Sequence, residues 1–222
     1  MQGEDWIVPQ QEEVLRSRAL DDIPELLLAD KVSHAVADLV QATPVDARPR
    51  ERAPGEFQHQ ALWLMAVIGL RALRAAMNVI AVGYEDQAAG YQRLIDELWN
   101  RAQKVRFDKS GNYAQQWCEG KPPGKAAKLT EQGLWEFWSR TQHADPAAVL
   151  NWVAITQEDG SATVLLGPER RPELVRGALT VMLSEVRDLG AMLAAQVSTA
   201  VPDLDSLTDE IVAAHRLHGL AD

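Results

Sequence analysis

The residues best suited to chemistry in this sequence gather in one stretch, residues 134–146, which reads LWEFWSRTQHADP. Ser139 and His143 stand four positions apart, so a helix would place both on one face. An imidazole titrates near neutral pH and can act as an acid, a base or a phosphate ligand. A histidine in the last turn can equally serve only to stabilise the helix end. Trp135 and Trp138 surround this pair and would wall a pocket that is polar at one end.

Two arginines on another element would add positive charge to this pocket. Arg71 and Arg74 lie three positions apart in an otherwise apolar stretch, and Asn78 follows one turn later. Because an unpaired buried charge is costly, we expect these groups to find partners. An aromatic helix packs best on the most apolar neighbour, so we expect His143 near both arginines and a site for a small anion or nucleotide. The catalytic candidates are His143, Arg71, Arg74 and Ser139, and the predicted ligand-binding residues are Trp135, Trp138, Lys125 and Lys128.

Other catalytic signatures are missing from the sequence. It contains no H-E-x-x-H, no cysteine pair and no G-x-S-x-G, and GKPPGKAAK lacks the spacing of a phosphate-binding loop. His215 and His218 stand three positions apart with no third ligand nearby in the sequence. Cys118 is the single cysteine, so it forms no intrachain disulfide, and nothing around it indicates a catalytic thiol. We therefore expect neither a metal nor a cofactor.

The charge is unevenly distributed along the chain. The net charge of −10 argues against a nucleic-acid partner, but residues 101–128 carry a net charge of +5, which leaves −15 for the rest. Such asymmetry indicates an anionic partner, although a solvated loop with ordinary lysines would look the same. The expected partners are an unknown protein or a small anionic ligand, with RNA as a further partner for the 101–128 segment.

The hydrophobic pattern predicts an all-α helical bundle with one small β-hairpin. The central helix, 56–82, is apolar nearly all round and is expected to be the most buried element. Alternating residues around Asp159 and Gly160 predict the hairpin near 153–166. Residues 107–124 are rich in Gly and Pro and are expected to interrupt the helices. The other predicted helices cover 10–20, 24–42, 85–105, about 125–144, 146–152, 172–197 and 206–220.

The sequence also predicts how the chain is divided and where in the cell the protein lies. Residues 1–54 are expected to form an N-terminal helical extension and linker, and residues 55–222 the helical-bundle domain. The longest apolar run, 61–70, is too short to span a bilayer, and the start of the chain is acidic and polar. These features predict a cytoplasmic protein with no membrane partner. Trp6, Trp63 and the long apolar stripe after Pro172 predict a homodimer.

The stretch from Arg71 to about Ala195 resembles an uncharacterised, mostly helical bacterial domain family of unknown function. Three features carry the resemblance: the helix LRALRAAMNVIAVGY, an aromatic residue followed by S-x-x-x-H from Trp138 to His143, and LLGPE before a final long helix. The resemblance implies a helical fold and a site, without a reaction. The sequence departs from the family pattern at Asn78, where an acidic residue is frequent, and at Trp138, where Tyr is usual.

A looser similarity is to HEPN domains, helical bundles that include ribonucleases of toxin and phage-defence systems. Their signature is R-x(4–6)-H on one helix. Arg140 and His143 are too close to fit it, and the segment from Arg52 to His59 is interrupted by a proline and a glycine.

Two functions are therefore open. The first is a helical binding or interaction module, acting in a bacterial stress or phage-defence system. The alternative is a metal-independent, HEPN-like ribonuclease in which His143 moves the proton and Arg71 and Arg74 stabilise the charge of the transition state. An open cleft that holds all three residues favours the enzyme, whereas a sealed, hydrogen-bonded cluster of the same residues favours the module.

Overall fold

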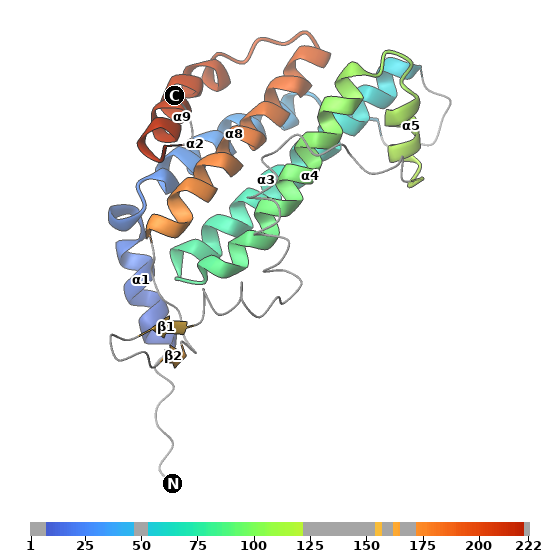
Figure 1. Cartoon of the computed structure of the whole chain (residues 1–222). Coiled ribbons are helices and arrows are strands. Elements are labelled where there is room, and N and C mark those ends of the chain that lie inside the picture. Colours follow the sequence, from blue (N-terminus) through green and yellow to red (C-terminus); the bar gives the residue numbers. More distant parts are fainter. Residues whose placement is uncertain (1–7, 47–52, 122–153, 157–161, 165–171, 220–222) are drawn as a thin grey trace.

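The computed structural model describes residues 8–46, 53–121, 154–156, 162–164 and 172–219. In this part of the chain the fold is mostly helical, as predicted. Figure 1 shows four long helices, α2, α3, α4 and α8, lying alongside one another, with α9 against α2 and α8 and with α5 at the far end beside α3. The helices are α1 (Val8–Asp22), α2 (Glu25–Ala42), α3 (Pro54–Ala81), α4 (Glu85–Phe107), α5 (Asn112–Cys118), α8 (Pro172–Gln196) and α9 (Pro202–Leu217).

Local signals account for the ends of the central helix, α3. Pro54 occupies the first turn, where its missing N–H costs nothing. The Glu56 carboxylate accepts a hydrogen bond from the backbone N–H of Ala53 at 3.3 Å, which satisfies one free donor at this end. After Ala81 the chain turns through Gly83, whose φ of 86° lies in the left-handed region that glycine tolerates.

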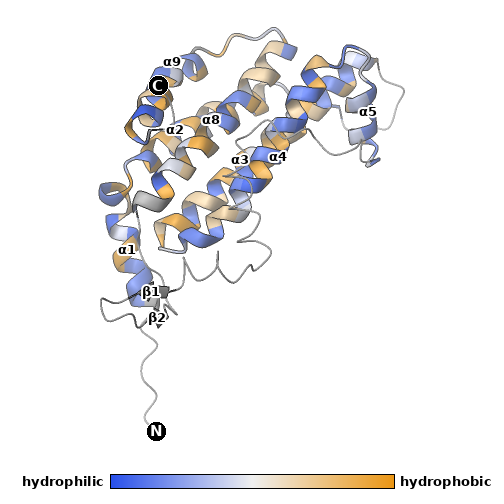
Figure 2. Cartoon of the chain, viewed as in Figure 1, coloured by the Kyte–Doolittle hydropathy of each residue, from blue (hydrophilic) through white to orange (hydrophobic). Residues whose placement is uncertain are grey.

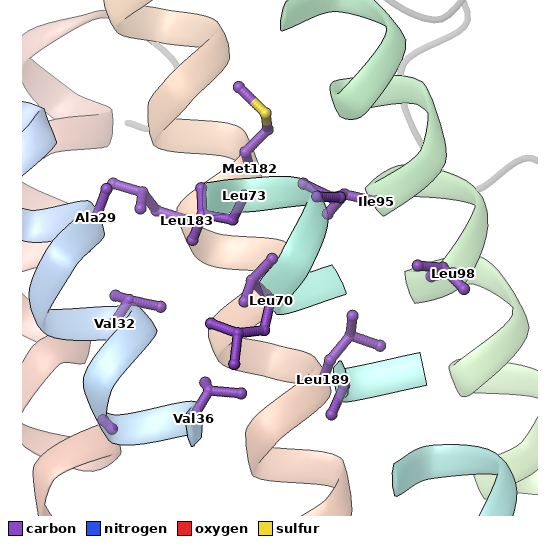
Figure 3. Close-up of a cluster of buried hydrophobic side chains, with 14 of the residues drawn as sticks. Ala29, Val32, Val36, Leu70, Leu73, Ile95, Leu98, Met182, Leu183 and Leu189 are labelled. Atoms are coloured by element: carbon purple, nitrogen blue, oxygen red, sulfur yellow. The ribbon is translucent and has the colours of Figure 1, made fainter. Parts of the chain in front are cut away.

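Apolar side chains from α2, α3, α4 and α8 meet in one core. Figure 3 shows Val32 and Val36 of α2 and Leu183 and Leu189 of α8 among the side chains of this core. In Figure 2 the hydrophobic colour likewise runs along the helices where they face one another. Burying one such side chain stabilises the fold by about 1.5–3 kcal/mol, so this core, rather than helix propensity, holds the bundle together. The other labelled members in Figure 3 are Ala29, Leu70, Leu73, Ile95, Leu98 and Met182.

The central helix α3 is not the most buried helix, so the prediction for residues 56–82 was wrong. Ten of its 28 residues are buried, against nine of the 18 residues of α2 and at least twelve of the 25 residues of α8. The reason is position: α8 packs against α2, α3, α4 and α9. The central helix instead keeps a face with the exposed residues Arg71, Arg74 and Asn78.

By length and composition alone, α3 is the helix among the described residues that could cross a membrane. Here it packs against α2, α4, α5 and α8, as the core helix of a bundle does. At Gly69 it approaches α8 closely, because a Cβ built there would lie 2.7 Å from Leu189 Cδ1.

Helix α5 corrects the prediction that residues 107–124 only interrupt the bundle. The Asp108 carboxylate organises the turn before α5: Oδ1 accepts the backbone N–H of Ser110 at 3.0 Å, and Oδ2 accepts that of Tyr113 at 2.7 Å. Gly111 adopts a φ of 72°, which the turn requires. Such local capping leaves little trace in a hydrophobic pattern, which explains the error. Similarly, α9 begins at Pro202 instead of the predicted Ser206, because a proline suits the first helical turn.

Two short strands lie between α5 and α8 in the sequence. Strand β1 (Ala154–Thr156) pairs antiparallel with β2 (Ala162–Val164), and Ile155 stands opposite Thr163. The residues that connect them lie outside the described residues, so the hairpin over 153–166 as a unit stays a prediction. The boundary between residues 54 and 55 also stays a prediction, although α2 shares the core of α3 and α8.

Candidate functional site

The structure describes only two members of the predicted pocket. Arg71 and Arg74 are both exposed on α3. The two arginines were expected to need partners because their helix was expected to be buried; at these exposed positions water can solvate both guanidinium groups. The other members of the predicted pocket lie outside the described residues, so their proximity to the arginines stays a prediction: Lys125, Lys128, Trp135, Trp138, Ser139 and His143.

A basic and aromatic surface lies where α4 ends, and we call it the α4–α5 corner; it consists of Lys104, Arg106, Phe107 and Lys109. Phe107 is 73% exposed. The Arg106 guanidinium carbon lies 5.7 Å from the centroid of the Phe107 ring. Lys104 Nζ lies 5.7 Å from the centroid of the Tyr113 ring. Arg106 and Lys109 are both exposed. The corner thus presents a bare aromatic ring among cations.

The charges next to the corner are largely engaged with each other. Arg101 donates to Glu97 at 2.5 Å, and Lys121 donates to Glu119 at 2.8 Å. Hydrogen bonds from the Ser110 side chain and from the Tyr113 backbone lower the pKa of Asp108. Asp108 therefore remains ionised and is occupied by the turn, while the corner itself carries a positive charge.

A pair of buried carboxyl groups joins α4 to α8. Asp96 is 5% exposed and Glu185 is 6% exposed. Gln92 Nε2 donates to Glu185 Oε2 at 3.3 Å, and Asn100 Nδ2 donates to Asp96 Oδ1 at 3.2 Å. Burial, and then the nearby negative charge of Asp96, raises the pKa of Glu185 well above its ordinary value of 4.5. The arrangement favours a protonated Glu185 hydrogen-bonded to Asp96.

A second buried carboxylate, Glu25, joins α2, α8 and α9. Arg176 Nε lies 3.0 and 2.9 Å from its two oxygens, Arg176 Nη2 donates at 2.8 Å, and His218 Nε2 lies 2.8 Å from Oε1. Burial by itself would raise the pKa of Glu25, but the hydrogen bonds from Arg176, the backbone and His218 lower it overall. Burial, and then His218, lowers the pKa of the neighbouring His215. This cluster ties helix ends together and exposes no reactive group.

Neither carboxyl cluster was predicted from the sequence. A signal existed on α4, where Gln92, Asp96 and Asn100 recur every four residues and so form one polar stripe. The sequence could not show that this stripe faces Glu185, because the two lie on helices far apart in the chain. Among the described residues, no group of three histidine, cysteine or acidic residues could hold a metal ion.

No family model, curated protein or solved structure matches this chain. The resemblance to a helical bacterial family and the looser similarity to HEPN domains therefore stay predictions.

Proposed function

We propose that this chain is a helical binding module that holds single-stranded RNA at the α4–α5 corner. The observation that carries the proposal is the 73% exposure of Phe107 beside Arg106 and Lys109. A base that stacks on an aromatic ring contributes about 1–3 kcal/mol, and neighbouring cations hold the phosphates. An exposed phenyl ring among cations matches this chemistry better than it matches an acidic peptide, because a peptide needs no flat stacking surface.

The overall charge sets the expected strength of binding. At −10 the whole chain repels a polyanion at long range, so the corner works against the field of the rest of the surface. The two exposed cations at the corner, Arg106 and Lys109, would contact about two phosphates. For a single strand this predicts a slope of about −1.4 in a plot of log affinity against log salt concentration. We expect weak binding that strengthens moderately as the salt concentration falls.

The two buried carboxyl clusters have a structural role. Glu25 is enclosed by Arg176 and His218, and Glu185 lies against Asp96 and Gln92, so in the described residues these polar groups hold helices together. The ribonuclease needs His143 beside Arg71 and Arg74. The same RNA experiment can therefore separate the two functions.

Fluorescence anisotropy of a labelled oligouridylate at low salt measures the binding. Phe107→Ala should weaken it by roughly 5–150-fold, the equivalent of 1–3 kcal/mol of stacking, whereas Phe107→Trp should retain it. Leu94→Ala is the matched control, since Leu94 is a 40% exposed apolar residue on the same helix. The double variant Arg106→Glu, Lys109→Glu should abolish binding.

Two results would overturn the proposal. One is RNA binding that is unchanged in Phe107→Ala but lost when Arg71 and Arg74 are replaced by glutamate, which would place the ligand on α3. The other is RNA cleavage by the wild type that disappears in His143→Ala, which would make the protein a ribonuclease.

A further inference from the structure

We propose that Asp96 and Glu185 share one proton that locks α4 onto α8, and that loss of this proton as the pH rises releases α4 from α8. The lock is a conformational device separate from the α4–α5 corner. It rests on the placement of two buried carboxyl groups on facing helices, within one hydrogen-bonded cluster.

The described surroundings of Glu185 oppose a second negative charge. Gln92 and Asn100 of α4 each donate one amide hydrogen bond to the pair. Within the part of the chain that the structure describes, the charged groups that act on Glu185 are Asp96 of α4 and Asp188 of α8, and both are acidic.

The other elements that pack on α8 bring apolar groups or engaged charges. Helices α2 and α3 meet it with buried apolar residues such as Val36 and Leu70. Arg187 of α8, two positions after Glu185 in the sequence, is held by Asp188 at 2.5 Å and by Thr208 of α9. A second ionised carboxylate would therefore meet repulsion and burial together, which one retained proton prevents.

The direction in which stability changes with pH follows from the number of protons that the folded and unfolded states bind. Between the ordinary pKa of 4.5 and the raised pKa of Glu185, the folded protein binds one proton more than the unfolded chain. Stability therefore falls as the pH rises through this window, by about tenfold in the folded-to-unfolded ratio per pH unit. Above the raised pKa this fall ends, and the repulsion between the two carboxylates is complete.

One hydrogen bond between α4 and α8 depends on the two helices staying in contact. Trp99 on α4 donates its indole N–H to Asp188 Oδ2 on α8 at 3.2 Å. Separation of the helices breaks this bond. The Glu25 cluster joins α8 to α2 and α9 instead, so those contacts do not depend on the shared proton.

Urea unfolding of the full chain between mildly acidic and alkaline pH tests the proposal. Relative to wild type, Glu185→Gln should become progressively more stable as the pH rises, because the amide cannot ionise. Asp96→Asn removes the repelling charge, so it should narrow the pH range over which stability falls. Glu97→Gln is the matched control, since Glu97 is an exposed acid on the same helix and should leave the pH slope unchanged.

Two spectroscopic readings follow the proton and the helix directly. At a pH between the ordinary and the raised pKa of Glu185, wild type should show the infrared carbonyl band of a protonated carboxyl group, and Glu185→Gln should lack it. At one alkaline pH, hydrogen exchange over residues 85–107 should be faster in wild type than in Glu185→Gln, with α2 unaffected.

An equal pH slope in wild type and Glu185→Gln would overturn the proposal, as would an infrared spectrum without the protonated band. Stabilisation of wild type by Mg²⁺ at alkaline pH that disappears in Glu185→Gln would overturn it too, because the pair would then hold a cation in place of a proton.

Discussion

Replacing Glu25 by glutamine removes the charge that joins three helices while keeping the side-chain volume. Glu25 is 5% exposed, and it receives Arg176 from α8 and His218 from the end of α9. In Glu25→Gln, one carbonyl oxygen can still accept a hydrogen bond. The Arg176 guanidinium then loses its paired charge.

The expected cost follows from burial. Removing one partner of a buried ion pair destabilises a protein by about 3–5 kcal/mol. The Arg176 side chain is 32% exposed, so water solvates part of its charge and lowers the cost. We expect Glu25→Gln to lose about 2–4 kcal/mol of unfolding free energy. For a chain of this length, that corresponds to a decrease in Tm of roughly 4–16 °C.

Urea denaturation of Glu25→Gln, of Arg176→Gln and of the double variant measures this cost and the coupling between the two residues. The control is Glu210→Gln, which breaks the bridge from Lys31 of α2 to Glu210 of α9. That pair is 2.7 Å apart, but its side chains are 55% and 50% exposed. Exposed pairs contribute about 0–1 kcal/mol, so the control should scarcely change stability.

The pH dependence adds an independent check. Because the pKa of Glu25 is lowered in the folded protein, its contribution is fully present above the unfolded value of 4.5 and is lost as the pH falls through the folded value. The difference between wild type and Glu25→Gln should therefore shrink below that pH. If Glu25→Gln is no more destabilised than Glu210→Gln, or if the coupling to Arg176 is below about 0.5 kcal/mol, the cluster does not stabilise the bundle as described.

Three further changes test the packing and capping. Gly69→Ala should lower the unfolding free energy by about 1–2 kcal/mol despite the better helix propensity of alanine, because the new Cβ would meet Leu189 Cδ1 at 2.7 Å. Gly55→Ala is the control and should not lower it, because the nearest atom there is 3.9 Å away. Equal Tm values for the two variants would contradict the close contact at Gly69. Asp108→Ala should lower the unfolding free energy by about 0.5–2 kcal/mol and speed hydrogen exchange over residues 112–118, because the turn loses its hydrogen-bond acceptors. Unchanged exchange over these residues would show that α5 does not need this carboxylate. Trp63→Phe should cost about 1 kcal/mol in urea titrations, because the 3.0 Å bond from Nε1 to the Val40 carbonyl disappears, and no loss would mean that water replaces it.

The hydrophobic pattern of the sequence determined the long helices of the bundle. It predicted the central helix within two residues at its start, from the apolar run and from Gly83 at its end. It also predicted that α2 and α8 begin beside Pro24 and Pro172. These features are local, because a proline, a glycine or a period of 3.6 acts through the backbone of a single helix.

The two buried carboxyl clusters depend on tertiary structure alone. Asp96 and Glu185 are 89 positions apart, and Glu25 and His218 are 193 positions apart, so no local pattern pairs them. The solvent exposure of Arg71 and Arg74 was not predicted for the same reason: the apolar residues around them suggested a helix that its neighbours cover, but the packed helices leave that face of α3 to solvent. Which side of a helix is covered depends on the neighbours it meets, and those neighbours come from distant segments of the chain, which periodicity within one helix does not encode.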